Sequence, residues 1–67
     1  MPMIHIELIE GRTDEQLAAF VAELTDAACR HLRCSREGVI VSIRDLPLSR
    51  YATGGVLWKD CPRPKEP

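Results

Sequence analysis

The feature that most constrains the fold of this chain is a change in its hydrophobic period, from two residues to about 3.6 and back to two. Near the start of the chain, Ile4, Ile6 and Leu8 alternate with polar side chains. A second alternating stretch covers residues 39–46, and a period of two is typical of strands. The residues between the two stretches repeat at helical spacing, so we expect a strand, a helix and a strand in that order.

Capping signals define the expected helix. Thr13 and Gln16 form a capping box, and Asp14 follows the cap at a position where the helix dipole favours an acid. Basic side chains among residues 31–33 suit the opposite end of the dipole. We therefore expect a helix of about 19 residues that begins near Asp14. The apolar side chains that recur at helical spacing within it are Leu17, Phe20, Val21, Leu24, Ala28 and Leu32.

This order of elements predicts a small α/β (α+β) fold, built on one β-α-β unit with two parallel strands and a right-handed crossover. One helix covers only one face of such a sheet, and parallel sheets are rarely stable with a face open to water. A chain of 67 residues also buries only about 60% of its unfolded surface, which is marginal for a monomer. We therefore expect the protein to assemble through its sheet into an oligomer.

The C-terminal part of the chain carries turn signals. Pro47 ends the second alternating stretch, and the pair Gly54-Gly55 lies between two short extended pieces, which predicts a small β-hairpin or arm. The last residues are rich in proline and charge. We expect one domain over residues 1–59 and a disordered tail over residues 60–67.

Composition excludes several classes of partner. The chain carries nine basic and ten acidic side chains, for a formal net charge of −1, and it has no basic stripe interleaved with aromatics, so no nucleic-acid partner is expected. It has neither an apolar run long enough to span a membrane nor a secretory leader, which predicts a cytoplasmic protein with no membrane partner. The three cysteines match no zinc or disulfide pattern. Reduced thiols are expected, with Cys29 inside the helix and Cys34 in the turn after it.

Two residues near the N-terminus indicate possible chemistry. Removal of Met1 would leave Pro2 with a free secondary amine, which can act as a base, and Arg12 can offer a bidentate fork to a carboxylate. In an extended chain the two lie roughly 25 Å apart, so they can meet only if two subunits pair their first strands antiparallel. A nearby cation and partial burial would then both lower the pKa of Pro2. On the residues alone, the alternative is that Pro2 simply opens a strand and Arg12 is a solvated turn residue.

The pattern P-x-I-x-I-x-L-x-E-G-R-[ST]-x-E-Q, which runs from Pro2 to Gln16, resembles the 4-oxalocrotonate tautomerase family of small tautomerases. The chain length, the strand-helix-strand order and the segment RYATGGVLW are also similar to that family. The resemblance covers about residues 2–58.

The resemblance implies a β-α-β fold whose dimers assemble, commonly as a trimer of dimers, which makes a homohexamer. It also implies a cofactor-free, metal-free tautomerase that moves a proton in an enolisable 2-keto acid or its enol. By the same resemblance, Pro2 would be the general base, Arg12 of a neighbouring subunit would bind the substrate carboxylate, and Tyr51 would form the aromatic wall of the pocket.

One position departs from the family pattern. The arginine with which family members polarise the substrate carbonyl aligns with Ile40, which puts a diacid substrate in doubt. Its role can fall to Arg50, to the Tyr51 hydroxyl as a hydrogen-bond donor, or to another nearby arginine. The other two candidates are Arg36 and Arg44. For His5, Glu7 and Trp58 we expect structural roles, with Trp58 as an anchor into a neighbouring subunit.

Three functions follow from these observations. The first is a tautomerase, with a hydratase or dehalogenase as a related activity that would need further carboxylates. The second is a non-catalytic or heteromeric assembly subunit with the same fold, and the third is a binding module for small acids. The Pro2 amine favours the first, because neither of the others requires a base.

Overall fold

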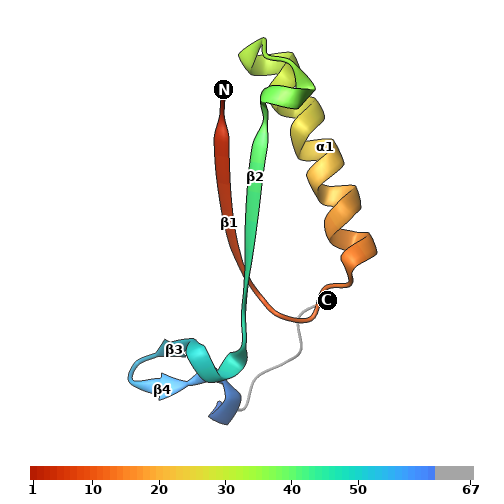
Figure 1. Ribbon diagram of the computed structural model, residues 1–67. Helices are drawn as coiled ribbons and strands as arrows, with labels where there is room; N and C mark the ends of the chain where they lie inside the picture. Colours follow the sequence, from red (N-terminus) through yellow and green to blue (C-terminus); the bar gives the residue numbers. More distant parts are fainter. Residues whose placement is uncertain (62–67) are drawn as a thin grey trace.

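The computed structural model describes residues 1–61. Its regular elements are, in chain order, β1 (Met3–Ile9), α1 (Asp14–Leu32), β2 (Ile40–Leu46), β3 (Ala52–Thr53) and β4 (Val56–Leu57). Three short 3-10 turns complete the chain, over Arg36–Gly38, Leu48–Arg50 and Trp58–Asp60. The expected strand-helix-strand order and the hairpin are both confirmed (Figure 1).

Strands β1 and β2 pair in parallel, as predicted, with Met3 opposite Ile40 and Ile9 opposite Leu46. The second strand begins at Ile40, one residue later than the alternation of residues 39–46 indicated. Val39 instead closes the preceding 3-10 turn, because its N–H donates to the carbonyl of Arg36 at 3.1 Å. The alternation itself continues through Val39, which is why pattern alone extends the strand.

The capping box of α1 is confirmed at its predicted residues. The Thr13 hydroxyl accepts from the Gln16 N–H at 3.1 Å, and the Gln16 side chain accepts from the Thr13 N–H at 2.9 Å. The helix ends at Leu32 because Arg33 adopts a left-handed conformation with φ of 55°. The two capping-box hydrogen bonds satisfy the backbone N–H groups of Thr13 and Gln16, which have no partner within the helix, and they fix where the helix begins.

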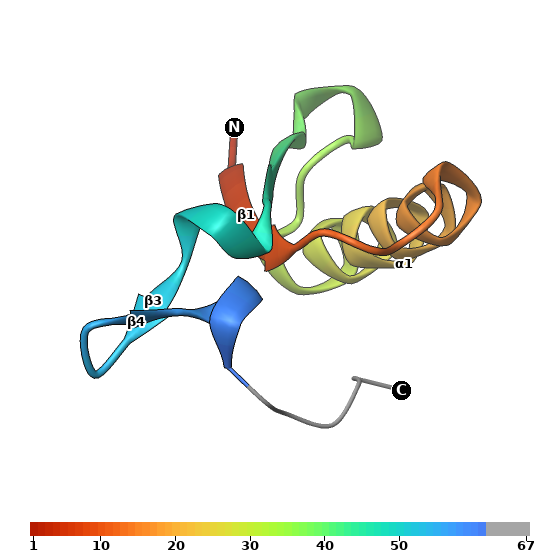
Figure 2. The ribbon, with the colours of Figure 1, turned by 90° about the horizontal axis from the view of Figure 1, so that it is seen from below.

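Helix α1 covers one face of the two-stranded sheet and leaves the other face open. Figures 1 and 2 agree that α1 lies on one side of the strands and that the β3–β4 hairpin projects on the opposite side. Along β1 the residues alternate between half-buried and exposed, with Ile4, Ile6 and Leu8 on the half-buried side. The period of two in the sequence therefore separates a helix-covered face from an open face.

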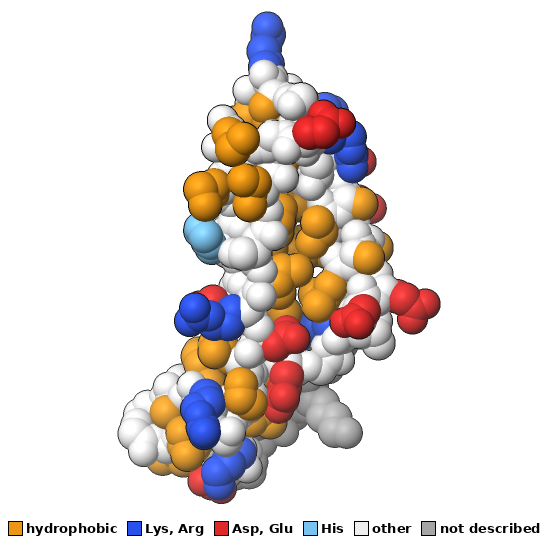
Figure 3. Space-filling view, in the orientation of Figure 1, with side chains coloured by type: hydrophobic (Ala, Val, Ile, Leu, Met, Phe, Trp, Pro, Cys, Tyr) orange, Lys and Arg blue, Asp and Glu red, His pale blue; other side chains and the backbone are white. Residues whose placement is uncertain are grey.

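The protomer is elongated and has a very small core. Its radius of gyration is 15.2 Å, compared with about 11 Å for a compact chain of this length. Among the described residues only Ala28 and Thr25 are buried, and no large side chain is fully enclosed. Met3 keeps 62% of its surface exposed and Leu32 61%, and apolar side chains reach the surface in Figure 3. One protomer therefore leaves exposed much of the apolar surface that a folded domain ordinarily buries.

The hairpin depends on two glycines. Gly54 and Gly55 have φ of 60° and 82°, and a two-residue turn with positive φ at both positions matches the twist of the flanking strands. Thr53 pairs with Val56 across this turn. Within the predicted tail of residues 60–67, Asp60 belongs to a 3-10 turn and the Cys61 N–H donates to the Trp58 carbonyl at 3.2 Å. The remainder, residues 62–67, lies outside the described residues.

Residues 1–61 contain no helix that is both long and apolar enough to cross a membrane. Over the same residues, no group of three or more His, Cys, Asp or Glu side chains is placed to hold a metal ion.

Candidate functional site

Pro2 lies at the beginning of β1, where the sheet starts. Its carbonyl accepts a hydrogen bond from the Ile40 N–H at 3.0 Å, and its side chain is half-buried. While Met1 is attached, the Pro2 nitrogen is an amide and has no basic lone pair. Met1 is 86% exposed. After removal of Met1, the amine of Pro2 would be held at a fixed place on the sheet edge.

Arg12 lies in the short connection between β1 and α1, beyond the other end of β1. The connection is fixed by Glu10, whose N–H donates to the Leu46 carbonyl at 3.0 Å. Gly11 then turns the chain with a φ of 127°, a backbone conformation that residues other than glycine rarely adopt. One guanidinium nitrogen of Arg12 donates to the Ile9 carbonyl at 3.2 Å. The sequence Glu-Gly-Arg therefore places a cation next to the carboxyl end of the strand.

Tyr51 is positioned by Trp58 within its own hairpin. The two rings meet edge to face with centroids 4.3 Å apart. The Trp58 N–H donates to the Tyr51 carbonyl at 2.7 Å, and the indole Nε1–H donates to the Thr53 hydroxyl at 3.0 Å. Sequence reasoning assigned Trp58 to a neighbouring subunit and missed this supporting role. The signal was present, because Tyr51 and Trp58 are equidistant from the Gly54-Gly55 turn and are therefore cross-strand neighbours.

The four predicted site residues fall into two groups at opposite ends of β1. Pro2 stands at the start of β1, whereas Arg12 follows the end of β1, and Arg50 and Tyr51 follow the end of β2. The seven residues of β1 span roughly 23 Å at about 3.3 Å per residue. A single protomer therefore does not bring Pro2 together with the other three residues.

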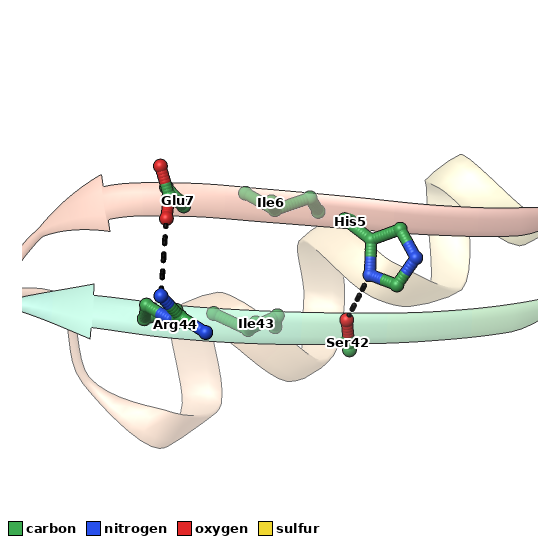
Figure 4. Close-up of a pocket in the computed structure, with 6 residues that line it drawn as sticks. All are labelled: His5, Ile6, Glu7, Ser42, Ile43 and Arg44. Atoms are coloured by element: carbon green, nitrogen blue, oxygen red, sulfur yellow. Dashed lines mark hydrogen bonds and ion pairs between the residues drawn. The ribbon is translucent and has the colours of Figure 1, made fainter.

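The open face of the sheet carries a hollow between β1 and β2, and two polar pairs cross it (Figure 4). His5 Nδ1 and the Ser42 hydroxyl share a hydrogen bond of 2.7 Å. Glu7 and Arg44 form an ion pair at 3.6 Å. The hollow is thus crossed by polar pairs between opposite residues of the parallel register, and Arg44 already has a carboxylate partner.

The two other arginines considered for carbonyl polarisation also have partners. Arg36 forms an ion pair with Asp26 of α1, and this hydrogen bond and charge raise the pKa of Arg36. Arg50 donates to the carbonyl and hydroxyl of Ser49 at 3.0 and 3.4 Å. By contrast, the Tyr51 hydroxyl makes no hydrogen bond to any group in residues 1–61. Among the four candidates, Tyr51 is therefore the donor with no competing partner in the described part of the chain.

Comparison with known proteins places this chain among tautomerases. The profile of a protein family described as "Tautomerase enzyme" matches residues 2–60. A probable tautomerase of Lactiplantibacillus plantarum is 40% identical over 60 residues, which are 90% of this chain and 94% of that protein.

Solved structures agree with this similarity. The crystal structure of a 4-oxalocrotonate tautomerase homologue, TTHB242, superposes with a TM-score of 0.86 at 33% identity, over 94% of this chain and all of that one. A heterohexameric 4-oxalocrotonate tautomerase from Chloroflexus aurantiacus superposes with a TM-score of 0.79 at 27% identity, over 90% of this chain and 97% of that one. The strand-helix-strand unit and the hairpin described above are therefore those of a known fold.

Proposed function

The chain belongs to the tautomerase family, and we propose that it is a cofactor-free tautomerase that moves a proton within an enolisable 2-keto acid or its enol. The observation that carries this proposal is the position of Pro2. It begins the stretch that matches the family, it follows an exposed Met1, and it is half-buried at the start of β1. An amine at this position is partly desolvated, which lowers its pKa toward the range in which a general base works best.

In the proposed reaction the Pro2 amine takes the proton from the substrate's enol hydroxyl and returns it to a carbon of the same conjugated system. The carbonyl forms as the carbon–hydrogen bond forms, so the substrate and product are isomers and no redox partner is needed. Arg12 binds the substrate carboxylate through two parallel hydrogen bonds. Its positive charge also lowers the pKa of the nearby ammonium form of Pro2.

The site is formed between protomers in this proposal. Because β1 holds Pro2 and Arg12 at opposite ends, antiparallel pairing of β1 from two protomers would bring each proline next to the partner's arginine. Within the described residues the only strand paired with β1 is β2, so the other edge of β1 is available for such pairing. The exposed apolar side chains, Met3 among them, support a homo-oligomer, either a dimer or a hexamer built as a trimer of dimers.

Tyr51 takes the place of the arginine that the family pattern has at Ile40. It forms the wall of the pocket, and its hydroxyl donates to the carbonyl oxygen on which negative charge develops. Arg50, next to it in the chain, is proposed as a second contact to the substrate. Ile40 supplies no cation to polarise the carbonyl of a diacid in the way the family's arginine does, so the proposed substrate is a small monocarboxylate.

The test compares the wild type with a Pro2→Ala variant, after intact mass has shown that Met1 is absent from both. We expect the wild type to ketonise phenylenolpyruvate faster than 2-hydroxymuconate, and Pro2→Ala to lose on the order of 10² to 10⁴ in kcat/KM. Arg30→Ala is the matched control, because Arg30 lies in the last turn of α1 and has no role in the proposed site. Equal rates for the wild type and Pro2→Ala would exclude Pro2 as the base.

A heteromeric assembly subunit is a second candidate, which two observations favour. One structural neighbour is a heterohexamer, and Ile40 provides no polarising group at the start of β2. Native mass spectrometry of the purified protein separates the two candidates. An active homo-oligomer supports the first, whereas an inactive chain that gains activity with a second tautomerase subunit supports the second.

A further inference from the structure

An exposed apolar pair lies at the end of the sheet where Pro2 stands. Met3 and Ile40 are register partners in the parallel ladder, and they keep 62% and 42% of their surface exposed. Side chains alternate between the two faces of a strand, and the alternating burial of β1 and β2 places both residues on the face that α1 leaves open. The pair is therefore an apolar surface on the open face, next to the proposed base.

The rest of this face is polar. The next pair along it, His5 and Ser42, shares a hydrogen bond of 2.7 Å, and the pair after that, Glu7 and Arg44, forms an ion pair at 3.6 Å (Figure 4). Successive side chains on one face of a strand are roughly 6.6 Å apart, at about 3.3 Å per residue. The apolar surface is thus limited to a single cross-strand pair at the Pro2 end of the sheet.

The position of the apolar pair indicates what contacts it. Met3 follows Pro2 directly, and the Ile40 N–H donates to the Pro2 carbonyl at 3.0 Å. Antiparallel pairing of β1 from two protomers, as proposed for the site, uses the backbone at the strand edge and leaves the side chains on the open face uncovered. A substrate whose carboxylate is held by the partner's arginine, with its reacting atoms at the proline amine, has its remaining end next to this pair.

We propose that Met3 and Ile40 form the specificity subsite for the end of the substrate opposite its carboxylate. The substrate class is then 2-keto acids, and their enols, that carry a short apolar tail. An apolar tail removes water from both side chains, whereas a second carboxylate would lose hydration beside two side chains that offer it no hydrogen bond. The polar pairs further along the face limit the tail to about the size of one phenyl or isobutyl group. The inference rests on the proposed function and deepens it, because it names the tail that the site selects.

Met3 provides a spectroscopic probe for the test. The chain has two methionines, so after removal of Met1 a protein labelled with carbon-13 at the methionine methyl groups gives one methionine signal by NMR. The two ligands are 3-phenylpropionate and glutarate, which are unreactive acids with an apolar tail and a carboxylate tail. We expect phenylpropionate to shift the Met3 signal upfield in a saturable way, through the ring current of its phenyl group, and glutarate to leave the signal unchanged.

Variants of Ile40 measure how much the subsite contributes. Ile40→Thr keeps a β-branched residue in the strand but makes the surface polar, so the Kd of phenylpropionate should rise about 10-fold. Ile40→Val stays apolar and should retain most of the affinity. Val56→Thr is the matched control, because Val56 is an apolar strand residue of β4 with 47% of its surface exposed and lies outside the proposed subsite. Its Kd should equal that of the wild type.

Two results would overturn the subsite. One is a Met3 signal that phenylpropionate does not move, as expected if a second copy of the chain covers the pair. The other is an Ile40→Thr variant that binds phenylpropionate as tightly as the wild type. Failure of the proposed function is a separate result, because it is equal ketonisation by the wild type and Pro2→Ala, whereas the binding of these ligands requires no turnover.

Discussion

Mixed oligomers of two inactive variants provide the sharpest test of a site shared between protomers. The variants are Pro2→Ala and Arg12→Ala. Since β1 separates the two residues by roughly 23 Å within one chain, each proposed site takes its proline from one protomer and its arginine from another. We expect each variant alone to lose at least about 10²-fold in kcat/KM, because each lacks a group that acts on the substrate.

The recovery on mixing follows from counting. When equal amounts of the two variants are unfolded and refolded together, about one half of all sites receive an intact proline and, independently, about one half receive an intact arginine. About a quarter of the sites contain both groups, so the mixture should recover about a quarter of the wild-type rate. A site formed within one chain gives no recovery, because no chain in the mixture carries both residues.

The assay is the ketonisation of phenylenolpyruvate, followed by ultraviolet absorbance, with native mass spectrometry to show that the oligomers contain both chains. A matched mixture of Pro2→Ala with Arg30→Ala should retain about one half of the wild-type rate, because there only the proline is limiting. Mixed oligomers no more active than the average of their two components would refute the shared site.

Three further predictions concern the pocket, the helix cap and a thiol. Tyr51→Phe should lower kcat by on the order of 10²-fold, because the variant lacks the hydroxyl that donates to the developing oxyanion. Trp58→Leu should mainly raise KM, because Tyr51 loses the ring that positions it. Steady-state kinetics distinguish the two effects, and an unchanged kcat in Tyr51→Phe would show that the hydroxyl has no part in the mechanism. Thr13→Ala should lower the free energy of unfolding by about 1 kcal/mol in urea titrations, and Thr13→Ser should not, because only the alanine removes the cap acceptor. Burial, and after it the neighbouring Cys34, raises the pKa of Cys29 above its ordinary value in the folded protein. The contribution of Cys29 to stability is therefore complete below its unfolded-state pKa and declines as the pH rises through the folded value. Alkylation of Cys29 should accordingly need a higher pH in the folded protein than in urea, and identical pH profiles would contradict the raised pKa.

Local spacing predicted most of the fold. The capping box of Thr13 and Gln16, the alternation in β1 and the Gly54-Gly55 turn are all confirmed, because each depends on residues within a few positions of one another. The one shifted boundary, at Val39, has the same origin. The Val39 N–H donates to the Arg36 carbonyl and so belongs to the preceding turn, which delays the start of β2 to Ile40; a hydropathy pattern does not register a backbone hydrogen bond.

The side-chain contacts of the candidate site residues could not be predicted from local spacing in the sequence. Nothing in the order of residues shows that Arg36 pairs with Asp26, that Arg44 pairs with Glu7, or that the Cys34 thiol contacts the Ala28 carbonyl. These contacts depend on the parallel register of the strands and on how the chain turns at Arg33. Sequence reasoning offered Arg36 and Arg44 as candidates for polarising a carbonyl, and each has a carboxylate neighbour in the folded chain.

The sequence by itself determined the order of the elements, the family and the candidate base, since hydrophobic period, capping residues and the motif from Pro2 to Gln16 are properties of neighbouring residues. Only the tertiary structure decided how those residues are distributed in space. A rigid parallel strand keeps Pro2 and Arg12 at its two ends, and one helix leaves half of the sheet uncovered. The physical reason is that a strand cannot fold back on itself, so its two ends can meet only through a second copy of the chain.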